Sequence, residues 1–226
     1  MTVRPAVIVL DVNETLSDMS PMAARFAEVG VSGALARVWF ATLLRDGFAL
    51  TAAGDRGTFA DMAAEVLRGL LDGEDLNRPL GHAVEHVMAG MAALGLHEDV
   101  ADGVRELHQA GRRLITLTNG SSMVAKKIFG AAGILDVFEA LLSVDDAPAW
   151  KPAPDSYLYA ARVTGVDPSE MMMVAVHPWD IHGAAAAGLR TAWINRSGAR
   201  YPAYFTPPEH NVTALTDLPD VLAHSA

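Results

Sequence analysis

Four separate segments of the chain place polar or ionisable side chains directly after an apolar run of strand length. Carboxylate, ammonium and imidazole groups recur among them, and such groups perform nucleophilic and acid–base chemistry when they are held together. The four groups are Asp11, Asn13, Glu14 and Thr15; Thr118, Asn119, Gly120 and Ser121; Asp145, Asp146 and Lys151; and His177 with Asp180. Convergence of these residue types from four segments is the pattern of a catalytic site.

The apolar runs that precede these groups predict the strands of a parallel sheet. They are continuous rather than alternating, which is typical of strands that helices cover on both faces. The runs span residues 6–10, 114–117, 141–144, 171–176 and 191–194. Helical patterns follow over residues 121–132, 155–163 and 179–187. We therefore expect a doubly wound α/β fold, in which ligands bind outside the carboxyl ends of the strands.

Residues 17–95 interrupt this alternation with helical patterns alone. The patterns span residues 34–50, 59–71 and 83–94, and glycines and a proline separate them. We expect two domains: an α/β core formed by residues 1–16 and 96–226, and an inserted helical domain over residues 17–95. Near the end of the chain, the turn-rich residues 201–208 predict an irregular segment, followed by a short helix near 218–223.

Composition limits the classes of function. The chain has 226 residues, 51% of them apolar and 19% charged, which is a globular composition. Its net charge of −10 and its lack of basic runs argue against nucleic acid as a partner. It contains no cysteine, which excludes disulfides, thiolate metal sites and a cysteine nucleophile. No apolar run approaches the roughly 18 residues that span a bilayer, so we expect a cytoplasmic enzyme without membrane contact.

Four stretches carry a resemblance to a known group of proteins. They are VIVLDVNETLSD at 7–18, TLTNGSS at 116–122, SVDDAPAWKPAPDSY at 143–157 and VAVHPWDIHGAAAAGLRTAWINR at 174–196. In this order they resemble the four motifs of the haloacid dehalogenase superfamily, and the helical insertion resembles its cap domain. The TNGS stretch, the Lys-Pro pair followed by Tyr, and the W-I-N-R stretch are most similar to the type II 2-haloacid dehalogenases.

The resemblance implies a hydrolase that acts on the carbon–halogen bond of a small anionic 2-haloacid. Asp11 would attack the halogen-bearing carbon and form an ester, which water would hydrolyse to the 2-hydroxy acid. The resemblance implies that the reaction needs no organic cofactor and no metal. It also implies a homodimer, because many related enzymes are dimers. The residues it suggests for substrate binding are Thr15, Phe40, Thr118, Asn119, Tyr157 and Trp179.

Lys151 is the expected counter-charge of the nucleophile. Three carboxylates would crowd the site, and two like charges about 4 Å apart repel by about 4 kcal/mol at an effective dielectric constant of about 20. Without a nearby cation, Asp11 would take up a proton and lose its nucleophilicity. We expect Lys151 to keep Asp11 ionised, beside Asp180 and with hydrogen bonds from Thr15 and Thr118.

Three positions depart from the pattern of type II enzymes. Glu14 stands where these enzymes usually have Gly, and His177 where they usually have Asn. Because imidazole titrates near neutrality and a carboxylate can orient it, the sequence suggests Glu14 and His177 as a water-activating pair. Phe40 aligns with the family's cap arginine, which helps to hold halide; Arg37 and Arg45 on the same predicted helix are candidate substitutes.

Each of these residues also has a purely structural interpretation. Asp11 would then end a strand, Asp180 would be a carboxylate at a helix N-terminus, and Lys151 would lie on the surface. In the same interpretation, His177 and Tyr157 would be packing residues.

Two other functions and one metal site remain open at this level. A Mg²⁺-dependent phosphatase or phosphonatase of the same superfamily would need an acidic residue two positions after the nucleophile, where this chain has Asn13. A catalytically idle relative that binds a small acid or a partner is favoured mainly by Phe40. The residues His82, Glu85 and His86 match a zinc-binding spacing, but no third ligand accompanies them.

Overall fold

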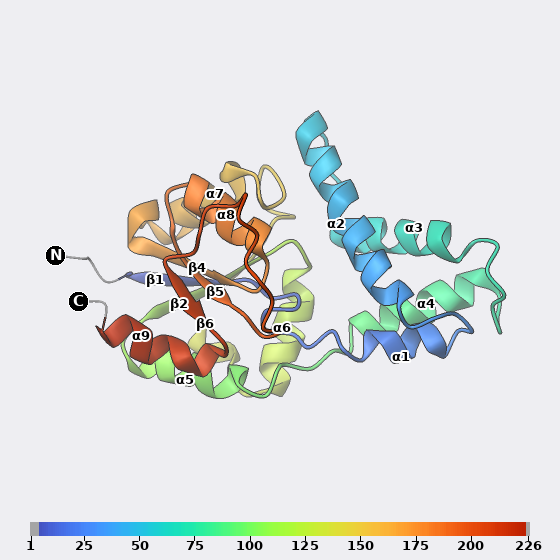
Figure 1. The fold of residues 1–226 in the computed structure, drawn as a ribbon, viewed down its shortest axis with the longest axis horizontal. Helices are drawn as coiled ribbons and strands as arrows, with labels where there is room; N and C mark the ends of the chain where they lie inside the picture. The colour runs from blue at the N-terminus through green and yellow to red at the C-terminus, as the bar shows by residue number, and fades with distance from the viewer. Residues whose placement is uncertain (1–4, 225–226) are drawn as a thin grey trace. The chain divides into compact units, whose positions relative to one another are not determined.

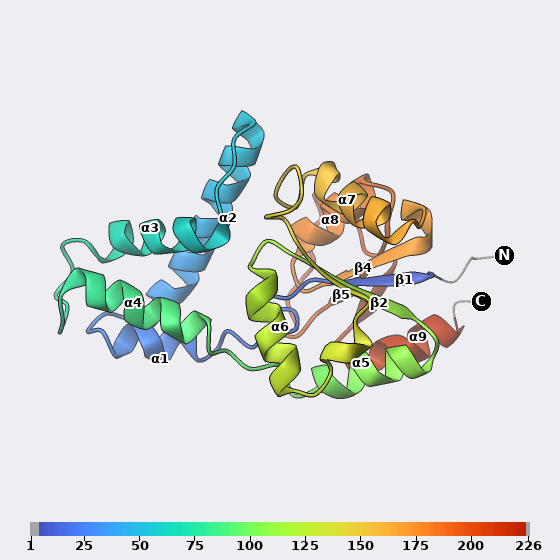
Figure 2. The ribbon, with the colours of Figure 1, turned by 180° about the vertical axis from the view of Figure 1, so that it is seen from behind.

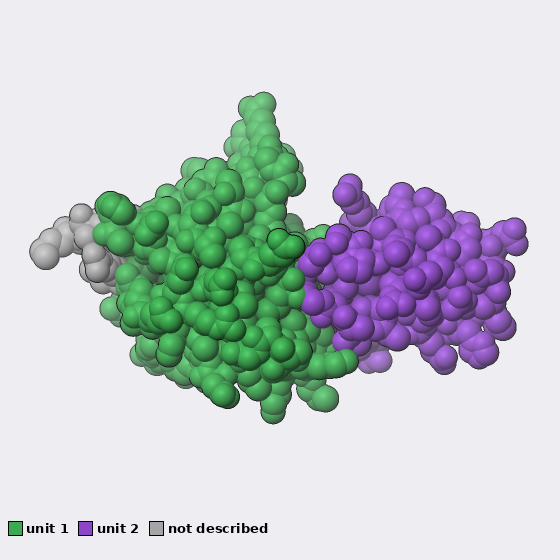
Figure 3. Space-filling model, turned by 90° about the horizontal axis from the view of Figure 1, so that it is seen from below, with its two compact units in different colours: residues 1–17, 96–226 green, residues 18–95 purple. Residues whose placement is uncertain are grey.

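A computed structural model describes residues 5–224 of the protein. The chain divides into two compact units, one formed by residues 1–17 and 96–226 and the other by residues 18–95, coloured green and purple in Figure 3. The limits of the expected core at residues 1 and 226 lie outside the described residues.

The first unit is built on a parallel six-stranded sheet within the described residues, in the order β3-β2-β1-β4-β5-β6. The strands are β1 Val7–Leu10, β2 Arg113–Thr118, β3 Ala140–Ser143, β4 Met171–Ala175, β5 Arg190–Ile194 and β6 His210–Val212. This sheet confirms the predicted α/β class and all five predicted strands. The edge strand β6 was not predicted, because only one of its three residues, Val212, is apolar.

Helices cover both faces of this sheet, as Figure 1 and the reverse view in Figure 2 show. One face carries α5 Val100–Gln109, α6 Ser122–Ala131 and α9 Leu218–His224, and the other carries α7 Pro154–Thr164 and α8 Pro178–Ala186. Side chains alternate between the two buried layers: Ile8 and Leu10 face the first, and Val7 and Val9 the second. Burial on both sides explains why the strands read as uninterrupted apolar runs.

The predicted helices of this unit are present, and one helix was not predicted. The apolar spacing of Val100, Val104 and Leu107 places these residues on one buried face of α5, so its signal was present in the sequence. Short 3-10 helices complete the unit. They are η1 Leu135–Val137, η2 Pro168–Glu170 and η3 Leu215–Asp217.

The register of the three central strands brings their carboxyl ends to the same edge of the sheet, although β2 continues two residues and β4 one residue past the level of Leu10. Leu10 of β1 lies beside Thr116 of β2 on one side and Val174 of β4 on the other. The chain positions that follow these strands therefore meet at one edge of the sheet, where open parallel sheets bind ligands. Asp11 and His177 come to this edge from β1 and β4 respectively.

The second unit is helical throughout its described residues, 18–95. Its helices are α1 Met22–Ala27, α2 Leu35–Ala53, α3 Phe59–Leu71 and α4 Leu80–Met91, of which α1 was not predicted. Trp39 is fully buried and donates a hydrogen bond from its indole Nε1 to the carbonyl of Ala63 at 3.0 Å, joining α2 to α3. The Thr58 side chain caps α3 by accepting from the Asp61 N–H. Of the helices within residues 5–224, none combines the length and apolar character needed to cross a membrane.

Candidate active site

A buried ion-pair network lies directly after β1. The Lys151 ammonium donates to Asp11 Oδ1 at 2.9 Å and to Asp180 Oδ2 at 2.5 Å. The other carboxylate oxygen of Asp11, Oδ2, accepts a hydrogen bond from the Thr15 hydroxyl at 2.6 Å. Lys151 and Asp180 are inaccessible to solvent and Asp11 is 3% exposed. The sequence prediction that these four residues converge agrees with this geometry.

The electrostatics of this network keep Asp11 charged. Burial alone would raise the pKa of Asp11, but the charge of Lys151 and hydrogen bonds from His177 and Thr15 outweigh it and hold the pKa below its ordinary range. For Lys151, burial is likewise outweighed by the two carboxylates, which raise its pKa. Burial and the nearby Asp11 charge raise the pKa of Asp180, while Lys151 and Tyr157 act in the opposite direction. The Asp11 carboxylate is therefore ionised and shielded from water, next to the charged ammonium of Lys151.

The side chain of Asn119 holds the main chain of Lys151. Its Oδ1 accepts from the Lys151 N–H at 3.0 Å, and its Nδ2 donates to the Lys151 carbonyl at 3.1 Å. The Thr118 hydroxyl accepts from the Gly120 N–H at 2.9 Å. Asn119 and Thr118 were expected at the substrate, and Thr118 also as a donor to Asp11. In the structure their polar groups shape the loop that carries the site, and no hydrogen bond from Thr118 to Asp11 is formed. Contact of these two residues with substrate stays a prediction.

Tyr157 performs a similar function for Asp180. Its hydroxyl donates to Asp180 Oδ1 at 2.6 Å, and its ring is fully buried. The close approach depends on Gly183 of α8, where an added Cβ would lie 2.8 Å from the Tyr157 hydroxyl and 2.6 Å from Cβ of Pro152. Sequence reasoning proposed Tyr157 as a substrate contact and did not identify Gly183.

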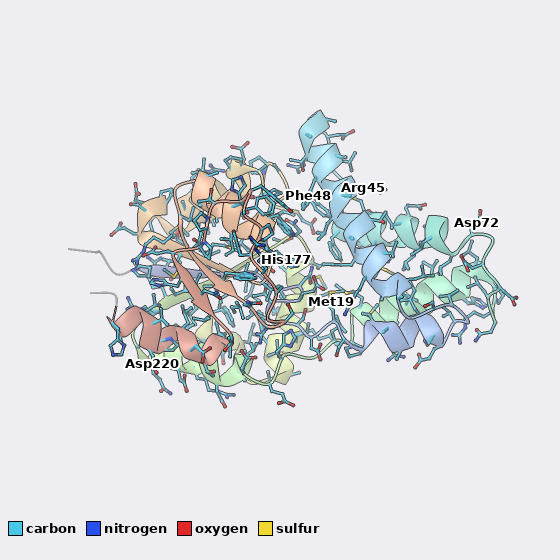
Figure 4. All side chains as sticks on the ribbon, in the orientation of Figure 1. Met19, Arg45, Phe48, Asp72, His177 and Asp220 are labelled. Carbon is cyan, nitrogen blue, oxygen red and sulfur yellow. The ribbon has the colours of Figure 1, made fainter. Side chains whose placement is uncertain are left out.

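His177 lies between two carboxylates at the rim of this network. Its Nδ1 is 3.3 Å from Asp11 Oδ2, and its Nε2 is 2.8 Å from Glu14 Oε2. The ring stacks on Trp179 with 4.9 Å between centroids, and its side chain is 12% exposed. Burial alone would lower the pKa of His177, but Asp11 and Glu14 outweigh it and raise the pKa to about 9. Figure 4 labels His177 among the side chains of the first unit.

Glu14 adopts a backbone conformation that favours glycine. Its φ is +60°, in the left-handed region, and among the described residues no other residue except glycine has a positive φ. The Glu14 carbonyl accepts a hydrogen bond from His97 Nε2 at 3.0 Å. Strained residues of this kind cluster at functional sites, where the surrounding structure holds them in place. This position therefore carries a carboxylate at a cost in backbone energy.

Residues distant in sequence hold the loop after β1, and sequence reasoning missed them. Thr15 accepts at its hydroxyl from the Val176 N–H at 3.1 Å and at its carbonyl from Arg196 Nη2 at 2.9 Å. Arg196 is itself paired with Asp99 at 2.9 Å. Arg196 belongs to the W-I-N-R stretch, which was the available signal, but the type of a residue does not reveal which carbonyl it binds.

The family model of haloacid dehalogenase-like hydrolases matches residues 5–188, which include all the residues of the ion-pair network. The chain belongs to this family. Membership in the haloacid dehalogenase-like hydrolases agrees with the order of the four motifs and with the parallel sheet.

Several members of the haloacid dehalogenase-like family resemble this chain over its whole length. It is 30% identical to (S)-2-haloacid dehalogenase 4A of Burkholderia cepacia, over 95% of this chain and 94% of that protein. A crystal structure of a dehalogenase with an intermediate complex has a TM-score of 0.91 at 28% identity and covers 100% of both chains. L-2-haloacid dehalogenase of Xanthobacter autotrophicus with chloropropionic acid covalently bound has a TM-score of 0.86 at 26% identity, over 98% of this chain and 100% of that one.

The donor set of this haloacid dehalogenase-like protein does not fit a divalent metal. Asp11 and Asp180 are both bound to the Lys151 ammonium, and position 13 carries a neutral amide. Within residues 5–224, no group of three or more histidine and carboxylate side chains is arranged to hold a metal ion. In the second unit, His86 of the zinc-like pattern is paired with Glu28 at 2.6 Å.

The expected halide-binding residues belong to the second unit. Phe40 lies on α2 and is 6% exposed. Arg45, labelled on α2 in Figure 4, is exposed and forms an ion pair with Asp46 at 2.8 Å. A substrate contact by Phe40, like a halide contact by Arg37 or Arg45, stays a prediction.

Proposed function

We propose that this protein hydrolyses small 2-haloalkanoic acids to 2-hydroxy acids through an ester on Asp11. The buried, ionised Asp11 carboxylate, fixed by Lys151 at one oxygen and by Thr15 at the other, is the observation that carries this function. A carboxylate removed from water is a stronger nucleophile, and orientation alone lowers such barriers by roughly 7–11 kcal/mol. The names of the relatives, (S)- and L-2-haloacid dehalogenases, support the same substrate class.

The reaction proceeds in two steps. An oxygen of Asp11 attacks the carbon that bears the halogen, a carbon–oxygen bond forms, and halide leaves with the electrons of the carbon–halogen bond. Water then adds to the carbonyl carbon of the Asp11 ester and releases the 2-hydroxy acid. Lys151 and Thr15 hold the carboxylate, and Asp180 and Tyr157 hold Lys151 in place. Glu14 and His177 are the proposed water-activating pair.

Further features are proposed from the resemblance and the composition. The substrate is a small anion, and Trp179 contributes to its binding. The protein functions in the cytoplasm as a homodimer. No organic cofactor or metal takes part in the two steps above.

Two measurements on the purified protein distinguish the functions. Chloride release from 2-chloropropionate without phosphate release from p-nitrophenyl phosphate and Mg²⁺ is expected. Phosphate release alone would show a phosphatase in place of the proposed function. Absence of both chloride and phosphate release would show an idle acid-binding relative.

Isotope labelling tests the ester itself. In a single turnover in H₂¹⁸O with enzyme in excess, the heavy oxygen is expected in the peptide that contains residue 11. Label found in the product alone would show direct attack by water and would overturn the nucleophilic role of Asp11.

A further inference from the structure

Both ring nitrogens of His177 face a carboxylate. Nδ1 is 3.3 Å from Asp11 Oδ2 and Nε2 is 2.8 Å from Glu14 Oε2. An ionised carboxylate only accepts hydrogen bonds, so the contact with Glu14 requires a proton on Nε2. A proton on Nδ1 as well makes its 3.3 Å approach to Asp11 Oδ2 an attractive ion pair, where a lone pair would be repelled. The raised pKa of about 9 agrees with this charge state. In the resting protein His177 is therefore an imidazolium, which has no lone pair with which to take a proton from water.

We infer that ester formation on Asp11 converts His177 from a resting imidazolium into the base for the hydrolytic water. This inference rests on the proposed function, because it requires the ester. When Asp11 becomes an ester, it loses its negative charge, and the imidazolium loses one of the two anions that hold it. The base is thus produced only after the nucleophile has reacted.

The groups around His177 favour this change. Asp11 faces it from the end of β1, Glu14 from the following loop, and Trp179 covers its ring from α8. The Lys151 ammonium donates hydrogen bonds to the other oxygen of Asp11, Oδ1, and to Asp180. Once Asp11 is an ester, no negative charge at this position offsets the Lys151 ammonium. The ammonium then disfavours a second buried cation nearby, the His177 imidazolium.

Glu14 decides which nitrogen loses its proton. Its carboxylate lies opposite Nε2 and retains the Nε2 proton in a hydrogen bond at 2.8 Å. The proton that leaves is therefore the one on Nδ1, and the freed lone pair faces Asp11. The carboxylate of Glu14, whose backbone has a strained φ of +60°, thus orients the neutral imidazole.

The steps balance in protons and charge. As halide leaves, Nδ1 releases one proton to solvent. The oxygen of water then bonds to the ester carbonyl carbon while one of its protons moves to Nδ1. The tetrahedral intermediate expels the product alkoxide, which takes the remaining proton from the Asp11 carboxyl group. The cycle restores the Asp11 carboxylate and the His177 imidazolium, with one proton and one halide released for each substrate.

Nuclear magnetic resonance of histidine-labelled protein tests this inference without any turnover. The ¹⁵N shifts of His177 are followed between pH 5 and 10 in the wild type and in two variants that lack the Asp11 charge, Asp11→Asn and Asp11→Ser. His210 on β6 is the internal control. The expected result is a His177 pKa near 9 in the wild type and a decrease of about two units in both variants.

The outcomes separate this inference from the proposed function. A neutral His177 at pH 7 in the wild type would overturn the inference, and so would a protonated His177 at pH 7 in both variants. A decrease in Asp11→Asn alone would also overturn it, since the amide N–H of that variant can itself impose a neutral ring. Halide release by the wild type tests the function independently. If the wild type releases halide but the His177 pKa is the same in the Asp11 variants as in the wild type, only the inference is rejected.

Discussion

Asn119 binds the main chain of Lys151 through both ends of its side-chain amide, at 3.0 Å to the N–H and 3.1 Å to the carbonyl. The amide comes from the loop after β2, and the lysine from the long loop between β3 and α7. This pairing fixes the point from which the Lys151 side chain reaches the carboxylates of Asp11 and Asp180. The position of the cation thus depends on the loop after β2.

Substitution of Lys151 should remove most activity. In Lys151→Met the two buried carboxylates lose their shared cation, and the pKa of Asp11 rises. We expect halide release at pH 7 to fall roughly 100- to 1000-fold and the free energy of unfolding to fall by roughly 3–5 kcal/mol. Lys126→Met, an exposed lysine on α6, is the matched control. Full turnover by Lys151→Met would disprove the role of the cation.

Loss of the Tyr157 hydroxyl should destabilise the protein. Tyr157→Phe leaves a buried oxygen of Asp180 without its 2.6 Å donor. We expect the free energy of unfolding in urea to fall by about 1–3 kcal/mol. Tyr159→Phe on the same helix, at a partly buried position, should stay within about 0.5 kcal/mol. Equal stability of the two variants would contradict a positioning role for the hydroxyl.

Replacement of His177 should separate the two chemical steps. His177→Asn retains the nucleophile and its cation, so the ester still forms. Hydrolysis of the ester loses its base and is expected to slow by roughly 10²- to 10⁴-fold. Rapid quenching followed by mass measurement of the peptide with residue 11 detects the accumulated ester. His182→Asn on the following helix, α8, is the control. Absence of accumulation in His177→Asn would reject the role.

Glu14 offers a paired test of backbone strain. Glu14→Gly and Glu14→Ala both remove the contact with His177, but only glycine adopts a φ of +60° without penalty. We therefore expect Glu14→Gly to be more stable than Glu14→Ala by about 1 kcal/mol, although both hydrolyse the ester slowly. Urea unfolding of the two variants measures the difference. A more stable alanine variant would show that the strain is absent.

The charge of His177 should make stability depend on pH in the alkaline range. Its pKa is about 9 in the folded protein and about 6.5 when unfolded. Because folding raises this pKa, the stabilisation is complete below about pH 6.5 and is lost as pH rises through about 9, on the order of 3 kcal/mol in total. Unfolding curves of the wild type and His177→Asn between pH 6 and 10 measure it. Parallel curves would contradict a charged His177.

The sheet was predictable because burial on both faces leaves an unmistakable pattern. Two of the central strands, Val7–Leu10 and Met171–Ala175, contain no polar residue. The edge strand His210–Val212 contacts the core through Val212 alone, and three residues with one apolar side chain give no periodicity. The central strands were therefore readable, and this edge strand was not.

The site was only partly predictable because sequence indicates where a residue stands but not where its side chain points. Asp11 and Lys151 were found since their residue types and positions after strands restrict their roles. Asn119 and Tyr157 have polar groups that suit a substrate equally well, and in the structure they bind Lys151 and Asp180. Arg196 acts on a main-chain carbonyl 181 residues away, which no local pattern reveals.

The shared register of β1, β2 and β4 limits how this protein can change. One residue inserted in any of them would slide one wall of the site by about 3.3 Å past the other two, further than a hydrogen bond can stretch. The central strands therefore tolerate exchange of residues but not gain or loss of them. Variation in length, and with it the acquisition of new substrates, is left to the loops beyond the strand ends and to the inserted helices.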